Sequence, residues 1–242
     1  MIYYGSNPKP TNPTNYHFSA LPQSNKTVPP RASIKEKFPP VYTQTCGCCT
    51  SCAVLACDAY YYHDNKKWIP SFTFTYYNQL ILNDDRPLTD TGSNVEDALN
   101  ITRKKGVCNS KVWANTEPFD KKPSKEAYAD GLKGKEITKY YRIKNLYQLK
   151  QAISSNLPVA GSFAWCFTDY DDNYVMNTPT PEEARDCHSG HAIVLVGYDD
   201  KTQLFEFRNS WGKSWGNKGY AFITYETINR VLWFNDTYAI TK

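Results

Sequence analysis

The spacing of apolar residues changes along this chain, and that change limits the possible folds more than any other feature. Three segments repeat apolar side chains at three- and four-residue steps, which predicts helices over Cys49–Tyr62, Asn94–Lys105 and Leu146–Ser155. Runs rich in β-branched and aromatic residues predict strands over Lys139–Ile143, Pro158–Phe163, Ala192–Tyr198, Leu204–Arg208, Gly219–Tyr225 and Asp236–Ile240. Helices grouped ahead of strands are typical of the α+β class.

Local signals mark the ends of two of these helices. Ser93 and Glu96 form a capping box ahead of the second helix, and Gly106 ends it. Asn145 is the expected N-cap of the third helix. The polar, proline-containing segment Asp120–Lys125 is the expected crossing between a helical lobe, about residues 41–120, and a β lobe, about residues 121–242.

The N-terminal segment has a different composition from the rest of the chain. Eight of the fifteen prolines lie within the first forty residues. Because proline removes an amide donor and disfavours helix before it, residues 1–28 are expected to be an extended arm preceding a folded domain over residues 29–242. The arm is either a solvated tail or a docked, regulatory segment anchored by the aromatic residues Tyr3, Tyr4, Tyr16 and Phe18.

Length and charge exclude several classes of protein. A chain of 242 residues suffices for one large domain or two lobes that share a core. The net charge of +4, without a run of five like charges, does not suggest nucleic acid, and the longest apolar stretch, Ala192–Tyr198, is too short to span a membrane. No signal peptide is visible at Met1–Gly5, so an intracellular or particle-packaged protein is favoured over a secreted one. A monomer is expected.

The eight cysteines are unevenly spaced. Five of them lie within twelve residues, unlike the spread of a disulfide framework, so reduced thiols are expected. Cys166 and Cys187 flank a loop ahead of His191, and their positions leave a disulfide between them open.

Cys49 and His191 are the candidates for nucleophilic chemistry. Cys49 begins a predicted helix, where unpaired backbone amides favour a thiolate. A thiolate that expels an amine needs an acid–base partner, and His191 stands at the opening of an apolar strand. Eighteen residues later, Asn209 can accept the second imidazole N–H and orient the ring, and Trp211 can shield that bond from water.

These positions resemble the papain family of cysteine peptidases, in particular its bacterial- and viral-type members. The resemblance lies in Gln44–Cys49, Gly190–Ala192, Gly197–Tyr198, Asn209–Gly212 and Trp215–Tyr220. His191 follows Cys49 by 142 residues and Asn209 follows it by 160, close to the spacing in that family. The resemblance implies a helical lobe and a β-barrel-like lobe with the active-site cleft between them.

The resemblance also implies a role for each matched residue. Cys49 is the expected nucleophile, His191 the general acid–base and Asn209 the orienting residue, while Gln44 and the Cys49 amide form the oxyanion hole. Trp211 and Gly190 are expected at the substrate. The implied activity is hydrolysis of polypeptides through a thioester, with endopeptidase action favoured and no cofactor or metal required.

The sequence departs from the family pattern at three points. Gln44 stands five residues before Cys49, where the usual spacing is six, and Thr50 replaces the tryptophan that usually follows the nucleophile. The Gly-Cys-Asn-Gly-Gly element of plant and lysosomal members is absent, so their disulfide pattern does not carry over. The resemblance would also imply a prodomain of about a hundred residues, whereas an arm of roughly thirty residues precedes the match in this sequence.

Three other functions remain open on the sequence. Cys49 and Cys52 form a C-x-x-C at a helix start, as in dithiol redox proteins, whereas metal binding would use Cys46, Cys48, Cys49 and Cys52 at a spacing that no paired zinc motif has. A catalytically inactive relative that binds peptides is the third alternative. Neither a redox nor a metal role explains the Gly-His-Ala and Asn-Ser-Trp-Gly segments.

Overall fold

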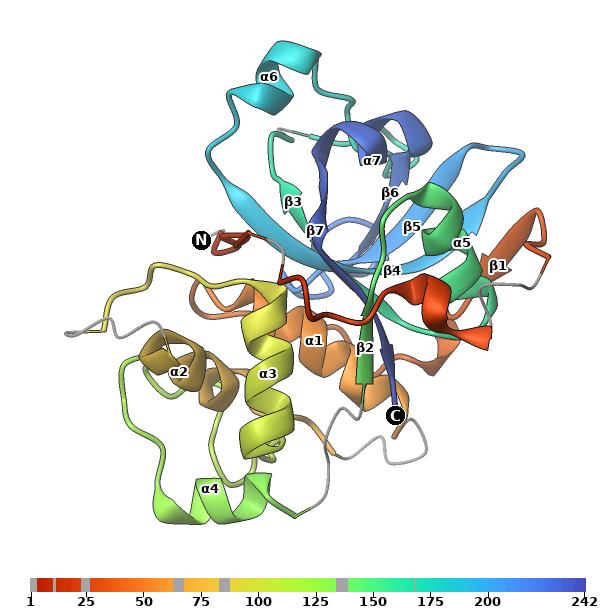
Figure 1. The fold of residues 1–242 in the computed structure, drawn as a ribbon. Coiled ribbons are helices and arrows are strands. Elements are labelled where there is room, and N and C mark those ends of the chain that lie inside the picture. The colour runs from red at the N-terminus through yellow and green to blue at the C-terminus, as the bar shows by residue number, and fades with distance from the viewer. Residues whose placement is uncertain are drawn as a thin grey trace.

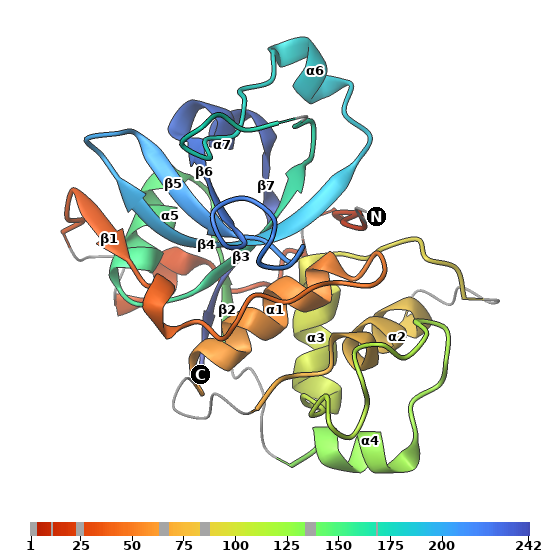
Figure 2. The same ribbon diagram turned by 180° about the vertical axis from the view of Figure 1, so that it is seen from behind.

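One side of the molecule is helical, and the other holds the sheet together with the remaining helices (Figure 1). The computed structural model describes residues 4–10, 12–22, 27–62, 68–82, 88–133, 139–167 and 169–242. The helical side consists of α1 (Cys49–Tyr60), α2 (Phe72–Leu82), α3 (Val95–Lys105) and α4 (Lys125–Gly131). Figure 2 shows α1 lying along the sheet, where it packs against β4.

The other side is built on one antiparallel sheet. Its strands are β1 (Arg31–Ser33), β2 (Lys139–Arg142), β3 (Val159–Ala164), β4 (Gly190–Asp199), β5 (Leu204–Arg208), β6 (Tyr220–Thr224) and β7 (Leu232–Thr241). They pair in the order β2-β7-β3-β4-β5-β6, with β1 added to β4. The α+β class is confirmed, but the sheet is not closed: in the described part of the chain, β2 and β6 are its ends and do not pair with each other, so the lobe is not a complete barrel.

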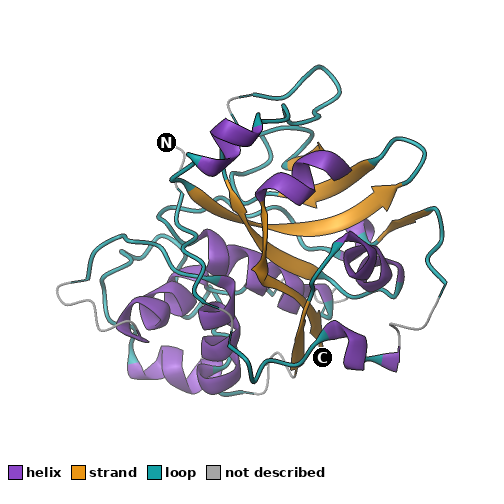
Figure 3. Ribbon diagram, turned by 45° about the horizontal axis from the view of Figure 1, so that its top comes forward, coloured by secondary structure: helices purple, strands orange, loops and turns teal. Residues whose placement is uncertain are grey.

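The long strand β4 divides the core in two. Ala192, Val194 and Val196 point into a core shared with the helices, while Ile193 and Leu195 point into a second core on the other face of the sheet. This alternation is the two-residue period of a strand that is buried on both faces. The helices α5 (Leu146–Ser154), α6 (Pro181–Arg185) and α7 (Tyr225–Val231) belong to the β side, where α5 and α7 pack on the sheet (Figure 3).

Several predicted element ends are confirmed. All twelve residues of α1 are buried, in agreement with a central helix. Asn145 caps α5 by accepting a hydrogen bond from the Gln148 amide, and Gly106 ends α3 with a φ of 72°, a conformation that suits glycine.

The predicted capping box of α3 is wrong. Asn94, one residue later than expected, is the N-cap and accepts from the Asp97 amide. The backbone of Ser93 instead pairs with the N-terminal arm, because its amide donates to Gly5 O at 2.7 Å and its carbonyl accepts from the Asn7 amide at 2.6 Å. The predicted cap residue, Ser93, therefore binds the N-terminal arm instead of capping the helix.

The helical side also extends beyond its expected limit. We expected the crossing at Asp120–Lys125, yet α4 begins at Lys125 and its Ala127 packs with Phe74, Cys108 and Trp113 on the helical side. Helix α2 was not predicted, because its alternating Phe-Thr-Phe-Thr start imitates a strand and its buried residues surround the helix. None of the described helices is both long enough and apolar enough to cross a membrane.

Candidate active site

Cys49 is the first residue of α1 and is fully buried. Its thiol lies within hydrogen-bonding reach of the backbone amides of Ala192, Thr50 and Gly5, which belong to β4, to α1 and to the arm. Burial raises the pKa of Cys49 to about 12, although these amides act in the opposite direction. The helix start alone would favour a thiolate, so in this closed arrangement desolvation outweighs it.

The neighbouring thiols form a separate cluster. The Cys48 thiol donates to Cys46 O at 3.5 Å, and burial raises the pKa of that thiol well above its usual range, with the Cys52 thiol adding to the shift. Cys49 has backbone partners instead. Within the described residues, no group of histidine, cysteine and acidic side chains could hold a metal ion.

His191 and Asn209 come together at the ends of neighbouring strands. His191 is the second residue of β4, Asn209 directly follows β5, and the His191 Nε2–Asn209 Oδ1 distance is 2.7 Å. The opposite ring nitrogen, Nδ1, is buried and has no hydrogen-bond partner among the described residues. Burial lowers the pKa of His191 to about 4, and the bond to Asn209 opposes that shift.

Aromatic rings surround the His191 imidazole. The Trp211 ring lies 4.5 Å away at an interplanar angle of 31°, and Trp165 approaches edge-on at 4.8 Å. Tyr4 of the arm makes edge contacts with His191 at 6.3 Å and with Trp211 at 5.9 Å. These rings exclude water from the His191–Asn209 bond, the role that the sequence assigned to Trp211 alone.

Gln44 is buried and tied to both sides of the site. Its Nε2 donates to Cys46 O at 2.9 Å, and its Oε1 accepts from the Ser210 hydroxyl at 2.5 Å. Its backbone amide also donates to Ser210 O at 2.8 Å. An amide nitrogen carries two hydrogens, so a bond to one carbonyl does not by itself prevent a second donation.

The arm occupies the surface beside Cys49. The amides of Gly5 and Ser6 donate to Gly190 O at 3.0 and 2.9 Å, so the predicted substrate contact Gly190 binds a peptide backbone here. A Cβ atom on Gly5 would stand 2.0 Å from Gly47 O, which shows how closely the arm lies against the loop before the nucleophile. Further along, Phe18 is buried in the second core, whereas Tyr16 is exposed and Tyr3 lies outside the described residues.

Comparison with known proteins identifies the family. The sequence profile of the papain family cysteine proteases matches residues 28–239. The chain belongs to this family.

Individual relatives agree with this placement. An uncharacterized peptidase C1-like protein of Acanthamoeba polyphaga mimivirus is 28% identical over 201 residues, which are 76% of this chain and 63% of that protein, so the chain spans less than two thirds of that relative. The structure of xylellain, a cysteine protease from Xylella fastidiosa, has a TM-score of 0.83 at 26% identity and covers 99% of this chain and 96% of its own. Digestive procathepsin L 3 of Tenebrio molitor shares the fold, with a TM-score of 0.71 at 14% identity over 99% and 76% of the two chains.

Some residues at this papain-family site were not predicted. Asp90 accepts hydrogen bonds from the Gly47 amide at 2.9 and 3.0 Å and from the Tyr76 hydroxyl at 2.6 Å, and that hydroxyl accepts from the Gly92 amide at 2.9 Å. Trp165 was not predicted either. It directly follows β3, a strand that was predicted to end at Phe163 and ends at Ala164. No motif could reveal these contacts, because each joins segments far apart in sequence.

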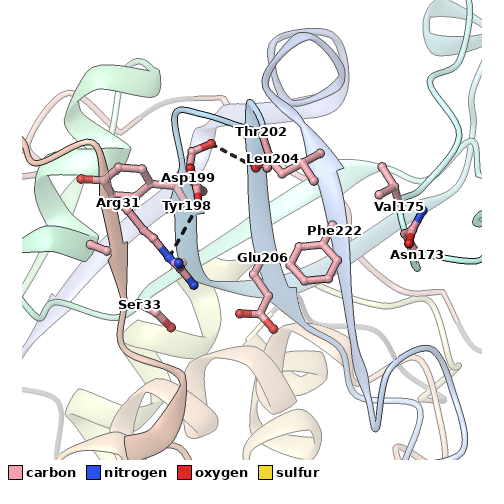
Figure 4. Close-up of a pocket in the computed structure, with 12 residues that line it drawn as sticks. Arg31, Ser33, Asn173, Val175, Tyr198, Asp199, Thr202, Leu204, Glu206 and Phe222 are labelled. Carbon is pink, nitrogen blue, oxygen red and sulfur yellow. Dashed lines mark hydrogen bonds and ion pairs between the residues drawn. The ribbon is translucent and has the colours of Figure 1, made fainter.

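A separate cavity lies away from this papain-type site. It has a volume of about 400 Å³ and opens between β1, β4, β5 and β6 (Figure 4). Its charged residues are paired: Arg31 lies 3.7 Å from Asp199, and Glu206 is bound by Lys35. Neither Cys49 nor His191 nor Asn209 lines this cavity.

Proposed function

We propose that this chain is a cysteine peptidase in which Cys49 is the nucleophile, His191 the general acid–base and Asn209 the orienting residue. The observation that carries the proposal is the 2.7 Å bond from His191 Nε2 to Asn209 Oδ1, together with the unpartnered Nδ1. The thiol of Cys49 reaches the amide of Ala192, the residue next to His191, so nucleophile and base belong to one small region.

In the proposed reaction, His191 Nδ1 takes the proton of the Cys49 thiol, and the sulfur attacks the carbonyl carbon of the scissile bond. The Cys49 amide and Gln44 stabilise the oxyanion. The tetrahedral intermediate collapses to a thioester, and the leaving amine takes the proton from His191. Water, deprotonated by His191, hydrolyses the thioester and restores the thiol.

We propose endopeptidase action on extended polypeptides. Support comes from the path of the arm, which shows that a peptide backbone fits beside Cys49 and bonds to Gly190 O and Ser93. Beyond these contacts the arm continues along α3, where Lys9 forms an ion pair with Asp97 at 2.6 Å. A substrate that uses the same groups would be gripped on at least one side of the scissile bond.

The same contacts support a regulatory role for the arm. Gly5 and Tyr4 cover Cys49 and His191, so we propose that the docked arm restrains peptidase activity. A shortened chain that begins at Asn7 removes these contacts but keeps the buried Phe18. Its kcat/KM should exceed that of the full chain; an equal value would contradict restraint.

Hydrolysis of a fluorogenic peptide library, followed by labelling of the thiols and peptide mass spectrometry, tests the proposed activity. Cys49→Ala should abolish hydrolysis, whereas Cys52→Ala should retain it. Equal loss in both variants would favour the C-x-x-C redox reading. Peptide binding without turnover in the wild-type chain shortened to Asn7 would favour the inactive peptide-binding relative.

A further inference from the structure

Cys166 and Cys187 stand at the base of the loop that leads to His191. Strands β3 and β4 are antiparallel, and their last paired residues are Ala164 and Gly190. The pairing continues one step further, because the Trp165 amide donates to Ser189 O at 2.7 Å. Cys166 directly follows Trp165, and Cys187 lies two residues before Ser189, on the two chain segments that leave and re-enter the sheet.

The two thiols lie close to each other at this point, and each donates to a backbone carbonyl of its own segment: Cys166 Sγ to Ala164 O at 3.5 Å, and Cys187 Sγ to Ser189 O at 3.6 Å. Burial, and then the neighbouring Cys187 thiol, raise the pKa of Cys166 to about 12.

Exposure separates this pair from the other thiols. All eight cysteines are free, and the other six, including Cys49, are buried, whereas Cys166 and Cys187 are partly exposed. A reagent in solution therefore reaches this pair while the docked arm covers Cys49. Proximity and access coincide at one pair of thiols only.

We propose that Cys166 and Cys187 are a site of reversible oxidation, at which a small-molecule disulfide of the glutathione class converts them into an intramolecular disulfide. Cys187 attacks one sulfur of the oxidant, whose S–S bond breaks, and the first small thiol leaves with the Cys187 proton. Cys166 then attacks the Cys187 sulfur of the mixed disulfide, and the second small thiol leaves with the Cys166 proton. The pair loses two electrons, and the oxidant gains them.

The disulfide would close the loop beside the residues that surround His191, and it would leave the Cys49 thiol unmodified. Trp165, next to Cys166, contacts His191 and Trp211, and Gly190 O, three residues after Cys187, binds the arm. Tyr4 also lies near Cys187, which adds to the burial that raises the pKa of Tyr4. A covalent closure reduces the freedom of the unfolded loop, so the oxidised chain should unfold at a higher temperature.

The test uses the full chain with Cys49→Ala, which removes both autolysis and reaction at the nucleophile. The reduced protein is incubated with oxidised glutathione, quenched with acid and mapped without reduction. We expect a cross-linked Cys166–Cys187 peptide and a mass loss of two hydrogens. We also expect a higher Tm that dithiothreitol reverses. Because the readouts are mass and Tm, failure of the proposed peptidase activity would not affect them.

Two further variants identify the bond. Cys166→Ser should prevent the cross-link and abolish the Tm shift, with glutathione retained on Cys187. Cys108→Ser, which removes a buried thiol on the helical side, should leave both readouts unchanged. Stable glutathione adducts on both Cys166 and Cys187, a cross-link to another cysteine, or two thiols that stay fully alkylatable would overturn the proposal. An unchanged Tm in the cross-linked chain would contradict the stabilisation that we expect from closing the loop.

Discussion

The two halves of the candidate site are held in place by different kinds of contact. On the β side, His191 lies on β4 and Asn209 directly follows β5, the strand paired with it, and aromatic rings pack around the imidazole. On the helical side, the loop before Cys49 lies outside the sheet. Its backbone meets the Ser210–Trp211 segment at an isolated bridge from Thr43 and through the Gln44 amide, and side chains bind the part nearest Cys49. Gln44 binds Cys46 O, and Asp90 binds the Gly47 amide.

This difference predicts different responses to mutation. Strand pairing is distributed over many backbone bonds, so a single side chain on the β side can be removed without moving the strands. The nucleophile loop depends on a few side-chain bonds, each worth about 1 kcal/mol net, so a single substitution there can shift the loop. A substitution on the β side should therefore remove a reacting group while the backbone keeps its position. A substitution on the helical side should shift the loop while the reacting groups remain present.

The largest expected effect is that of His191→Ala. The variant removes the proposed acid–base while β4 keeps its pairing with β3 and β5, so kcat should fall by roughly 10⁴-fold or more with little change in structure. Steady-state kinetics and far-UV circular dichroism measure the two effects. Asn209→Ala should cost less, because Asn209 orients the ring and transfers no proton; an equal loss would mean that the two residues act as one unit.

Gln44→Ala is the counterpart on the helical side. If Gln44 donates to the oxyanion, kcat should fall by about 10²-fold. The substitution also breaks the bonds to Cys46 O and the Ser210 hydroxyl, so Ser210→Ala serves as the control that removes only the second of these. Wild-type kcat in Gln44→Ala would show that the five-residue spacing has displaced this side chain from the oxyanion hole.

The same contrast explains what could be predicted from the sequence. The helices α1, α3 and α5 and the six longer strands follow from local periodicity, and the His191–Asn209 segments are recognisable because each lies at a strand end. The supports of the Cys49 loop are not local: Asp90 lies 43 residues from Gly47, and nothing in its own surroundings indicates that partner. Ser93 shows the same limit, because a distant arm and not its helix determined its role.

The arm contacts both halves, so it tests whether they act together. Gly5→Ala would place a Cβ 2.0 Å from Gly47 O and should lift the arm from Cys49. Burial is the largest cause of the raised Cys49 pKa, so its relief should lower that pKa, even though the Gly5 amide, which acts in the opposite direction, is lost as well. Alkylation needs the thiolate, so iodoacetamide should label Cys49 about tenfold faster at neutral pH for each unit by which the pKa falls.

The control for this experiment is Tyr16→Ala, which alters an exposed arm residue far along the chain from the cleft. It should leave the alkylation rate of Cys49 unchanged. The pH at which alkylation reaches half its maximal rate should move downward in Gly5→Ala only. An unchanged profile in Gly5→Ala would mean that the burial of Cys49 does not depend on the arm.

Asp90→Asn should have the smallest effect, and it tests the bonds from the Gly47 amide and the Tyr76 hydroxyl to Asp90. The amide offers one acceptor oxygen where the carboxylate offers two, so it cannot fully serve both the Gly47 amide and the Tyr76 hydroxyl. The affected loops carry Gly47 and Gly92, which lie against the arm backbone where a substrate would bind. We expect kcat/KM to fall by about 5- to 10-fold, mostly through KM, in line with the net worth of about one hydrogen bond.

A matched substitution separates this effect from a general loss of stability. Asp130 also accepts a backbone hydrogen bond, from the Asn109 amide at 2.8 Å, but it does so on the far part of the helical side. Asp130→Asn should therefore lower Tm by a similar amount and leave KM unchanged. Tyr76→Phe should raise KM as Asp90→Asn does, since it removes the hydroxyl that links Asp90 to the Gly92 amide. If KM stays unchanged in both Asp90→Asn and Tyr76→Phe, the loop before Cys49 is held by its own backbone, and the contrast between the two halves of the site does not hold.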